Sequence, residues 1–136
     1  MAKESDKMDV VQEAESIINS LIFQNNRGYD EIPLTMSQLR KFLTAVNVLN
    51  NKVMADKIGQ ADRGDELSPD LAAEIQYLKV KLLYQAGRER NVKTFLEKGN
   101  LLKRIEGIGN SRKRYNEFSK LVEAIVAWHK FKGGRD

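Results

Sequence analysis

The chain is predicted to fold as an all-α protein, a compact bundle of about five helices that forms a single domain over residues 1–136. Apolar residues recur at intervals of three and four along nearly the whole chain, which is the period of an amphipathic helix. Residues that favour helix starts precede several of these segments, and only 2 prolines occur in 136 residues. The length is that of one domain with one core. No strand pattern is present, so no strand is expected.

The first helix is expected to begin at Ser5 or Asp6 and to end at Gln24. The polar segment 25–28 should stop it, and a turn should continue to Pro33. Three- and four-residue spacing predicts one buried stripe, formed by Met8, Val11, Ala14, Ile18, Leu21 and Ile22.

A capping box predicts the start of the second helix. Thr35 can cap the helix, and Gln38, three residues later, can reach back to it. The helix should end near Lys57 or Ile58, and the polar segment 59–67 should be a loop. The expected buried stripe consists of Leu39, Phe42, Leu43, Val46, Leu49 and Val53.

The third helix has the clearest predicted start. Ser68 can cap it, Pro69 suits the first helical position, and Asp70 complements the positive end of the helix dipole. It should run without interruption to Gly87, which we expect at the C-terminal cap. The expected core residues are Leu71, Ile75, Leu78 and Leu82.

Two further helices complete the predicted bundle. A short helix should span residues 91–98 and end at Gly99, and residues 101–105 should add a further turn or two. The last helix should begin at Asn110 or Ser111 and end near Phe131. Its expected buried side consists of Tyr115, Phe118, Val122 and Ile125, with Leu121 and Trp128 beside them.

Charge is distributed unevenly along the chain, although the net charge is only +4. Residues 1–34 contain three Lys or Arg and seven Asp or Glu, and residues 59–78 contain one and five. The other segments are basic. Residues 35–58 contain four Lys or Arg and one Asp or Glu, residues 79–100 contain six Lys or Arg and two Asp or Glu, and residues 101–136 contain nine Lys or Arg and four Asp or Glu. Gathered on one face, the basic segments would favour a polyanion such as nucleic acid or anionic lipid. Alternatively, these basic residues face solvent and only contribute to solubility.

The composition excludes most catalytic chemistry. No cysteine is present, which excludes disulfides, thiolate zinc sites and thiol nucleophiles. His129 is the only histidine, so histidine triads and multi-histidine metal sites are excluded too. We interpret His129 as a residue at the edge of the core. We therefore predict no catalytic residue, no metal site and no cofactor.

Weaker motifs do not change that prediction. Asp62, Asp65 and Glu66 lack the spacing of a calcium loop, and the segment 107–109 follows no strand and is no dinucleotide loop. No apolar run approaches the ~20 residues of a membrane-spanning helix, and no secretory signal opens the chain. The protein is expected to be cytoplasmic, without a membrane partner.

The third helix carries a second stripe besides its leucines. Tyr77, Lys81, Tyr84 and Arg88 are spaced by four, three and four residues, so they share one helix face. Aromatic rings beside cations suit single-stranded nucleic acid, because bases stack and phosphates pair with cations. Alternatively, the tyrosines pack on a neighbouring helix and the cations lie at the edge of that contact.

The second helix carries two polar rows. Lys41 and Lys52 are eleven residues apart and therefore lie on one face. The adjacent row consists of Arg40, Thr44, Asn47 and Asn51. These side chains can bind phosphate or ribose oxygens, or they can form an ordinary solvated face.

A third basic group surrounds the glycine turn at residues 107–109. It consists of Lys103, Arg104, Arg112, Lys113 and Arg114. It can bind phosphates, face solvent or meet an acidic surface on a partner, and the sequence does not separate these alternatives.

Three stretches together resemble a known family. They are residues 34–42 (LTMSQLRKF), 80–88 (VKLLYQAGR) and 123–136 (EAIVAWHKFKGGRD). On these motifs the chain resembles the small subunit of the type III-A CRISPR effector, the Csm complex. The similarity covers essentially the whole chain.

The resemblance implies an all-helical, non-catalytic subunit. Several copies would stack head to tail as an inner filament beside the backbone subunits and the large subunit, lining the channel in which guide RNA and target RNA pair. It also implies RNA-binding roles for the cations of the matching motifs, Arg40, Lys41, Lys81 and Arg88. Lys52 joins this set because it shares a helix face with Lys41. A purely structural subunit, whose basic faces dock acidic protein surfaces, is the alternative function.

Overall fold

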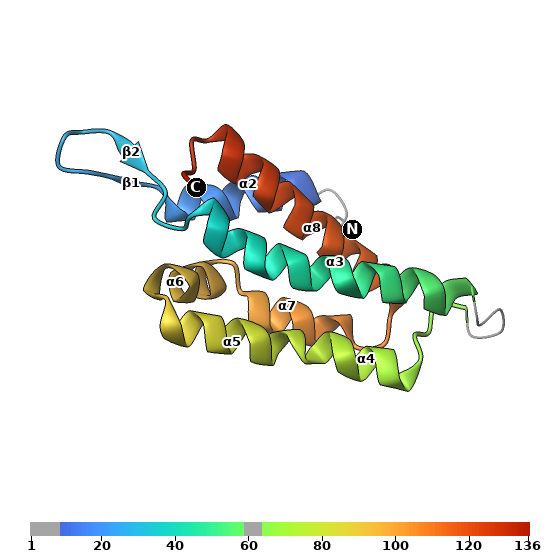
Figure 1. Ribbon diagram of the computed structural model, residues 1–136. Coiled ribbons are helices and arrows are strands. Elements are labelled where there is room, and N and C mark those ends of the chain that lie inside the picture. Colours follow the sequence, from blue (N-terminus) through green and yellow to red (C-terminus); the bar gives the residue numbers. More distant parts are fainter. Residues whose placement is uncertain (1–8, 59–63) are drawn as a thin grey trace.

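The computed structural model describes residues 9–58 and 64–136, most of which are helical (Figure 1). The elements are α2 (Val10–Leu21), β1 (Phe23–Gln24), β2 (Asp30–Glu31), α3 (Met36–Ile58), α4 (Pro69–Gln76), α5 (Leu78–Arg88), α6 (Arg90–Lys98), α7 (Leu101–Ile108) and α8 (Arg112–Phe131). The long helix α3 crosses the middle of the molecule in Figure 1 and packs against α8, α4 and α5, while α2 also contacts α6 and α8 also contacts α7. The predicted all-α class is therefore confirmed. No helix in the described residues is long and apolar enough to cross a membrane.

Buried apolar residues from all of these helices form one continuous core. The predicted stripe of α3 is confirmed at Leu39, Phe42, Val46, Leu49 and Val53, which are all buried, whereas Leu43 is half-buried. Phe42 meets Phe118 of α8 edge to face, with ring centroids 6.3 Å apart. These contacts fix α3 and α8 against each other.

A buried hydroxyl adds a polar contact between the same two helices. The Tyr115 hydroxyl oxygen lies 2.6 Å from Asn50 Oδ1 and 3.1 Å from the Val46 carbonyl oxygen. Burial raises the pKa of Tyr115 far above its usual value. The phenol therefore stays neutral and keeps its hydrogen-bonding proton.

The first helix differs from its prediction at its end. The predicted start and Met8 lie outside the described residues; the described helix begins at Val10, where the Asp9 side chain accepts a hydrogen bond from the Gln12 N–H at 2.7 Å. The helix ends at Leu21 rather than at Gln24, and Val11 is exposed rather than buried.

A small hairpin causes the early helix end. Strands β1 and β2 pair antiparallel, with Phe23 opposite Glu31, so the expectation of no strand is wrong. Asn25 Oδ1 accepts hydrogen bonds from the N–H groups of Arg27 and Tyr29, and Gly28 has a φ of 85°. The polar turn thus closes a hairpin, because an Asn side chain and a left-handed glycine supply its turn geometry.

The third predicted helix is two helices. Ser68 caps α4 as predicted, but the helical run is interrupted at Tyr77, whose N–H lies 3.1 Å from the carbonyl oxygens of both Ala73 and Glu74. This shared hydrogen bond tightens one turn before α5 begins. Gly87 lies inside α5 rather than at its C-terminal cap, which is Glu89.

The remaining boundaries agree closely with the sequence. Helix α6 begins one residue earlier than predicted and ends at Lys98, and the extra turn after Leu101 extends to Ile108 as α7. Ser111 caps α8, accepting a hydrogen bond from the Arg114 N–H at 3.1 Å.

Candidate nucleic-acid interface

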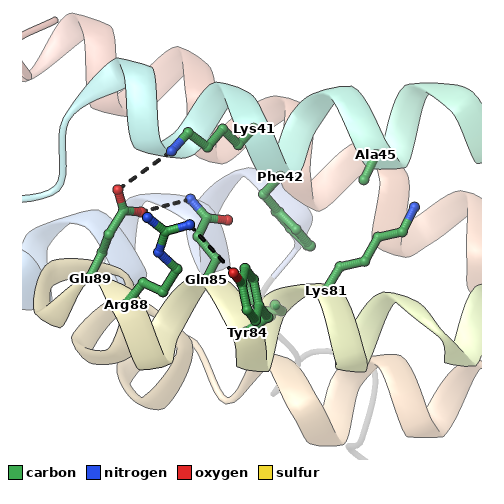
Figure 2. Close-up of a pocket in the computed structure, with 9 residues that line it drawn as sticks. Lys41, Phe42, Ala45, Lys81, Tyr84, Gln85, Arg88 and Glu89 are labelled. Atoms are coloured by element: carbon green, nitrogen blue, oxygen red, sulfur yellow. Dashed lines mark hydrogen bonds and ion pairs between the residues drawn. The ribbon is translucent and has the colours of Figure 1, made fainter.

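A groove between α3 and α5 brings together three of the predicted site residues. Lys41 extends from α3, and Lys81 and Arg88 extend from α5 (Figure 2). The groove has a volume of about 440 Å³, and its other lining residues are Phe42, Ala45, Leu82, Tyr84, Gln85 and Glu89. Helical spacing places Lys81 and Arg88 on one face of α5, and the packing of α5 beside α3 adds Lys41.

Polar contacts lie at one end of the groove, some within α5 and its C-terminal cap and some between α5 and α3. Gln85 Nε2 donates to the Gln38 carbonyl oxygen at 2.9 Å and to Glu89 Oε1 at 3.2 Å. Lys41 Nζ lies 3.5 Å from Glu89 Oε2, and its side chain remains 61% exposed. Because exposed ion pairs contribute only about 0–1 kcal/mol, Lys41 can exchange this partner for another anion at small cost.

Tyr84 and Arg88 form a second pair at the rim. The Arg88 guanidinium carbon lies 5.7 Å from the centroid of the Tyr84 ring, and Arg88 Nη1 lies 3.5 Å from the Tyr84 hydroxyl oxygen. Tyr84 is 67% exposed, so its ring does not pack on a neighbouring helix. The alternative in which this tyrosine joins a helix contact is therefore wrong.

Lys52 lies apart from the groove. It occupies a separate surface hollow together with the acidic residues Asp56, Asp70 and Glu74, and it forms an ion pair with Glu74. Lys41 and Lys52 thus share a face of α3 but have different surroundings. Arg40 is exposed on the neighbouring row of α3 together with Thr44, Asn47 and Asn51, outside the groove lining.

The basic group around the 107–109 turn is not one continuous patch, which corrects the prediction. Arg112 is buried: its guanidinium donates to the Val53 carbonyl oxygen and to Asp56 Oδ2, both at 3.0 Å. Arg104 Nη1 lies 3.0 Å from Glu13 Oε1, and Arg114 Nη1 donates to the Gly107 carbonyl oxygen. These arginines join helices and turns, leaving Lys103 and Lys113 exposed.

The other weak motifs have structural roles. His129 is fully buried rather than at the core edge, and Asp65 accepts hydrogen bonds from the Ser111 hydroxyl at 2.7 Å and the Lys113 N–H at 2.8 Å. Asp62 lies outside the described residues. Within residues 9–58 and 64–136, no group of three His, Cys, Asp or Glu residues could hold a metal ion.

Two groove residues escaped the sequence analysis. Gln85 and Glu89 are four residues apart and adjacent to the tyrosine and arginine stripe, so helical spacing could have placed them near it. Their contacts with Gln38 and Lys41, 47 and 48 residues away in sequence, carry no local signal. The groove therefore offers three cations, one carboxylate and one exposed aromatic ring.

Comparisons with known proteins agree with the resemblance. The family model described as Csm2 Type III-A matches residues 4–135. A protein of Mycobacterium tuberculosis named CRISPR system Cms protein Csm2 is 35% identical over 128 residues, covering 94% of each chain. Proteins of the same name from Streptococcus thermophilus and Enterococcus italicus are each 37% identical, over 93% and 79% of this chain and 93% and 77% of their own lengths. The chain therefore belongs to the Csm2 family, the small subunits of type III-A CRISPR systems.

Proposed function

We propose that this chain is a non-catalytic subunit of a type III-A CRISPR complex that binds the RNA backbone through the groove between α3 and α5. The observation that carries the proposal is the convergence of Lys41, Lys81 and Arg88 on one groove beside the exposed ring of Tyr84. Ammonium and guanidinium groups pair with phosphate whatever the base sequence, and guide–target pairing supplies sequence recognition in RNA-guided complexes. Arg40 and Lys52 would add contacts on either side.

The proposal includes target RNA and guide RNA as ligands, the backbone and large subunits as protein partners, and the cytoplasm as the place of action. Catalysis would belong to those other subunits. Family membership, the absence of cysteine and the single histidine support this division.

Head-to-tail self-association is part of the same proposal. Exposed acidic residues lie around the start of α4, at the end of the molecule opposite α6, and exposed cations lie on α6 (Figure 1). The acidic residues are Asp65, Glu66, Asp70 and Glu74, and α6 carries the cations Arg90, Lys93 and Lys98 against one exposed carboxylate, Glu97. Opposite charges at opposite ends favour head-to-tail contacts between copies.

Besides the alternative in which basic faces dock acidic protein surfaces, a different observation favours protein docking through an apolar face. Exposed apolar residues Tyr77, Val80 and Leu83 follow the outer face of the α4–α5 run, as a protein interface would require. RNA binding at the groove can therefore be tested separately from protein docking at this apolar face, by changing the groove cations and leaving the apolar face unchanged.

The test uses the complete complex, assembled with its other subunits. The variant K41A/K81A/R88A should weaken capture of target RNA, and the log–log salt slope should fall by up to about 2, because each single-strand phosphate contact contributes about 0.7. The matched control R27A/K120A/K130A removes the same charge from exposed positions outside both the groove and the proposed head-to-tail contact. Normal assembly with unchanged RNA affinity and salt slope would contradict the proposal, and failed assembly of the groove variant alone would favour the alternative in which the basic groove docks an acidic protein surface.

A further inference from the structure

We infer that the groove between α3 and α5 holds one unpaired nucleotide, with its base stacked on Tyr84 and its phosphate held by Lys81. The inference rests on the proposed RNA binding at this groove and goes beyond it. It assigns a base-binding residue, and it makes single-stranded RNA, rather than a duplex, the preferred ligand of the groove.

The first observation is the state of the Tyr84 ring. The ring is 67% exposed, whereas its neighbours Leu82 and Ala86 on the same helix are buried. The Arg88 guanidinium lies over the ring, 5.7 Å from its centroid, and Figure 2 shows the ring between Arg88 and Lys81. A base on the Lys81 side would extend a stack of guanidinium, phenol ring and base, and such stacking on aromatic rings is a general mode of single-strand recognition.

The second observation is the chemistry of the groove walls. The floor is apolar, formed by Phe42, Ala45 and Leu82, and the cations stand at the rim. A nucleotide has the same division, with a flat, largely apolar base face at one end and an anionic phosphate at the other. The volume of about 440 Å³ lies within the range of pockets that accept small organic ligands.

The third observation concerns the polar end of the groove. Gln85 Nε2 is committed to the Gln38 carbonyl oxygen and to Glu89 Oε1, so its amide orientation is fixed. The Glu89 carboxylate repels phosphate, and Lys41 lies 3.5 Å from it. The phosphate is therefore expected toward Lys81, and the base toward the Tyr84 ring.

A duplex cannot use this arrangement fully. In A-form RNA the bases are paired and stacked inside the helix, and the protein meets mainly phosphates and ribose hydroxyls. A duplex would gain from the three cations but would leave Tyr84 without a base. Replacing Tyr84 should therefore discriminate between the two forms of RNA, whereas replacing the cations should weaken both.

The experiment uses the full chain at low ionic strength. Its probes are a single-stranded oligouridylate, the same strand with one 2-aminopurine, and a blunt RNA duplex. The variants are Y84A, Y84F and the matched control L83A, because Leu83 is exposed on the same helix but lies outside the groove lining. Binding is measured by fluorescence anisotropy over a salt series, and circular dichroism verifies the helical fold of each variant.

We expect Y84A to weaken single-strand binding by about five- to a hundred-fold, the range of one base–aromatic stack. The salt slope and duplex binding should stay unchanged, and Y84F and L83A should bind like the parent chain. Quenching of 2-aminopurine should disappear in Y84A only.

Equal losses for single strand and duplex in Y84A, or an unchanged single-strand affinity, would overturn the inference. A loss in L83A equal to that in Y84A would also overturn it, since it would indicate an apolar docking face. The proposed function fails separately if K41A/K81A/R88A binds both RNAs as tightly as the parent chain. Absence of binding to either RNA by the parent chain would overturn both.

Discussion

His129 Nε2 lies 2.6 Å from the carbonyl oxygen of Leu34, which joins the end of α8 to the segment just before α3. A carbonyl oxygen only accepts, so Nε2 carries the proton of this buried imidazole. The C-terminal residues continue the contact: the Met36 N–H donates to the Arg135 carbonyl oxygen at 2.6 Å, and the Ser37 N–H donates to the Asp136 carbonyl oxygen at 3.2 Å. The C-terminal tail thus caps the helix that carries Lys41.

We predict that G134A destabilises the protein by about 1–3 kcal/mol, a typical cost of overpacking. A Cβ at Gly134 would lie 2.1 Å from His129 Cε1, and the buried ring cannot move away without breaking its hydrogen bond to the Leu34 carbonyl oxygen. The tail would therefore lift from α3. Urea unfolding measures the effect. The control G87A should stabilise slightly, because Gly87 is inside α5 with no atom within 4 Å of the added methyl. Equal stability of G134A and the parent chain would refute the packing role.

Removing the buried Arg112 side chain should destabilise the protein more than G134A does. In R112M, Asp56 loses its ion pair with Arg112 at 3.0 Å, and breaking a buried ion pair by removing one member costs about 3–5 kcal/mol. The cost should fall when Asp56 is neutralised in R112M/D56N, giving a favourable coupling in a double-mutant cycle measured by urea unfolding. Additive effects would show that the two side chains do not interact.

The contact between the Asp65 carboxylate and the Ser111 hydroxyl should stabilise the fold in a pH-dependent way. The hydrogen bond from the Ser111 hydroxyl, followed by that from the Lys113 N–H, lowers the pKa of Asp65 below its usual 3.8. A carboxylate whose pKa is lower in the folded state stabilises the fold at a pH above its unfolded-state pKa. This contribution is lost as the pH falls through the folded-state pKa. NMR titration of the Asp65 carboxyl carbon should show a higher pKa in S111A than in the parent chain. S111T, which keeps a hydroxyl, is the control; a pKa that S111A leaves unchanged would refute this cause.

The two lysines of the proposed site should differ in their effect on RNA. Lys81 lines the groove, whereas Lys52 pairs with Glu74 beside Asp56 and Asp70. These carboxylates repel phosphate, so K52A should weaken RNA capture by the complex less than K81A does. Each variant removes one positive charge, which makes them matched controls for each other. A larger loss in K52A would move the proposed interface toward α4.

Core truncation should separate folding from binding. Leu78 is 1% exposed, so L78A should cost about 2–5 kcal/mol, a large part of the ~5–15 kcal/mol that stabilises such a domain. We expect L78A to unfold at lower urea concentration and to assemble poorly, whereas K81A should assemble normally. The helical signal in circular dichroism and the yield of complex measure the two effects. Normal unfolding of L78A would contradict the core assignment.

The sequence by itself determined the elements whose signals are local. Thr35 and Gln38 form the predicted capping box, with the Gln38 N–H donating to Thr35 Oγ1 and the Thr35 N–H donating to Gln38 Oε1. Ser68 caps its helix where predicted, and Ser111, one of the two residues predicted to begin the last helix, caps α8. These contacts span three residues, so the spacing of residue types along the chain is sufficient to predict them.

Only the tertiary structure decided which cations are available. Arg112 and Arg114 are two residues apart in one basic run, yet the first is buried against α3 and the second is exposed. Lys41 and Lys52 occupy equivalent faces of α3, but one borders the groove and the other faces the acids of α4. Helical periodicity defines the face of a helix, whereas the packing of one helix against another determines which neighbour that face meets. The convergence of Lys41 with Lys81 and Arg88, 40 and 47 residues later in the sequence, therefore depends on how α5 packs against α3.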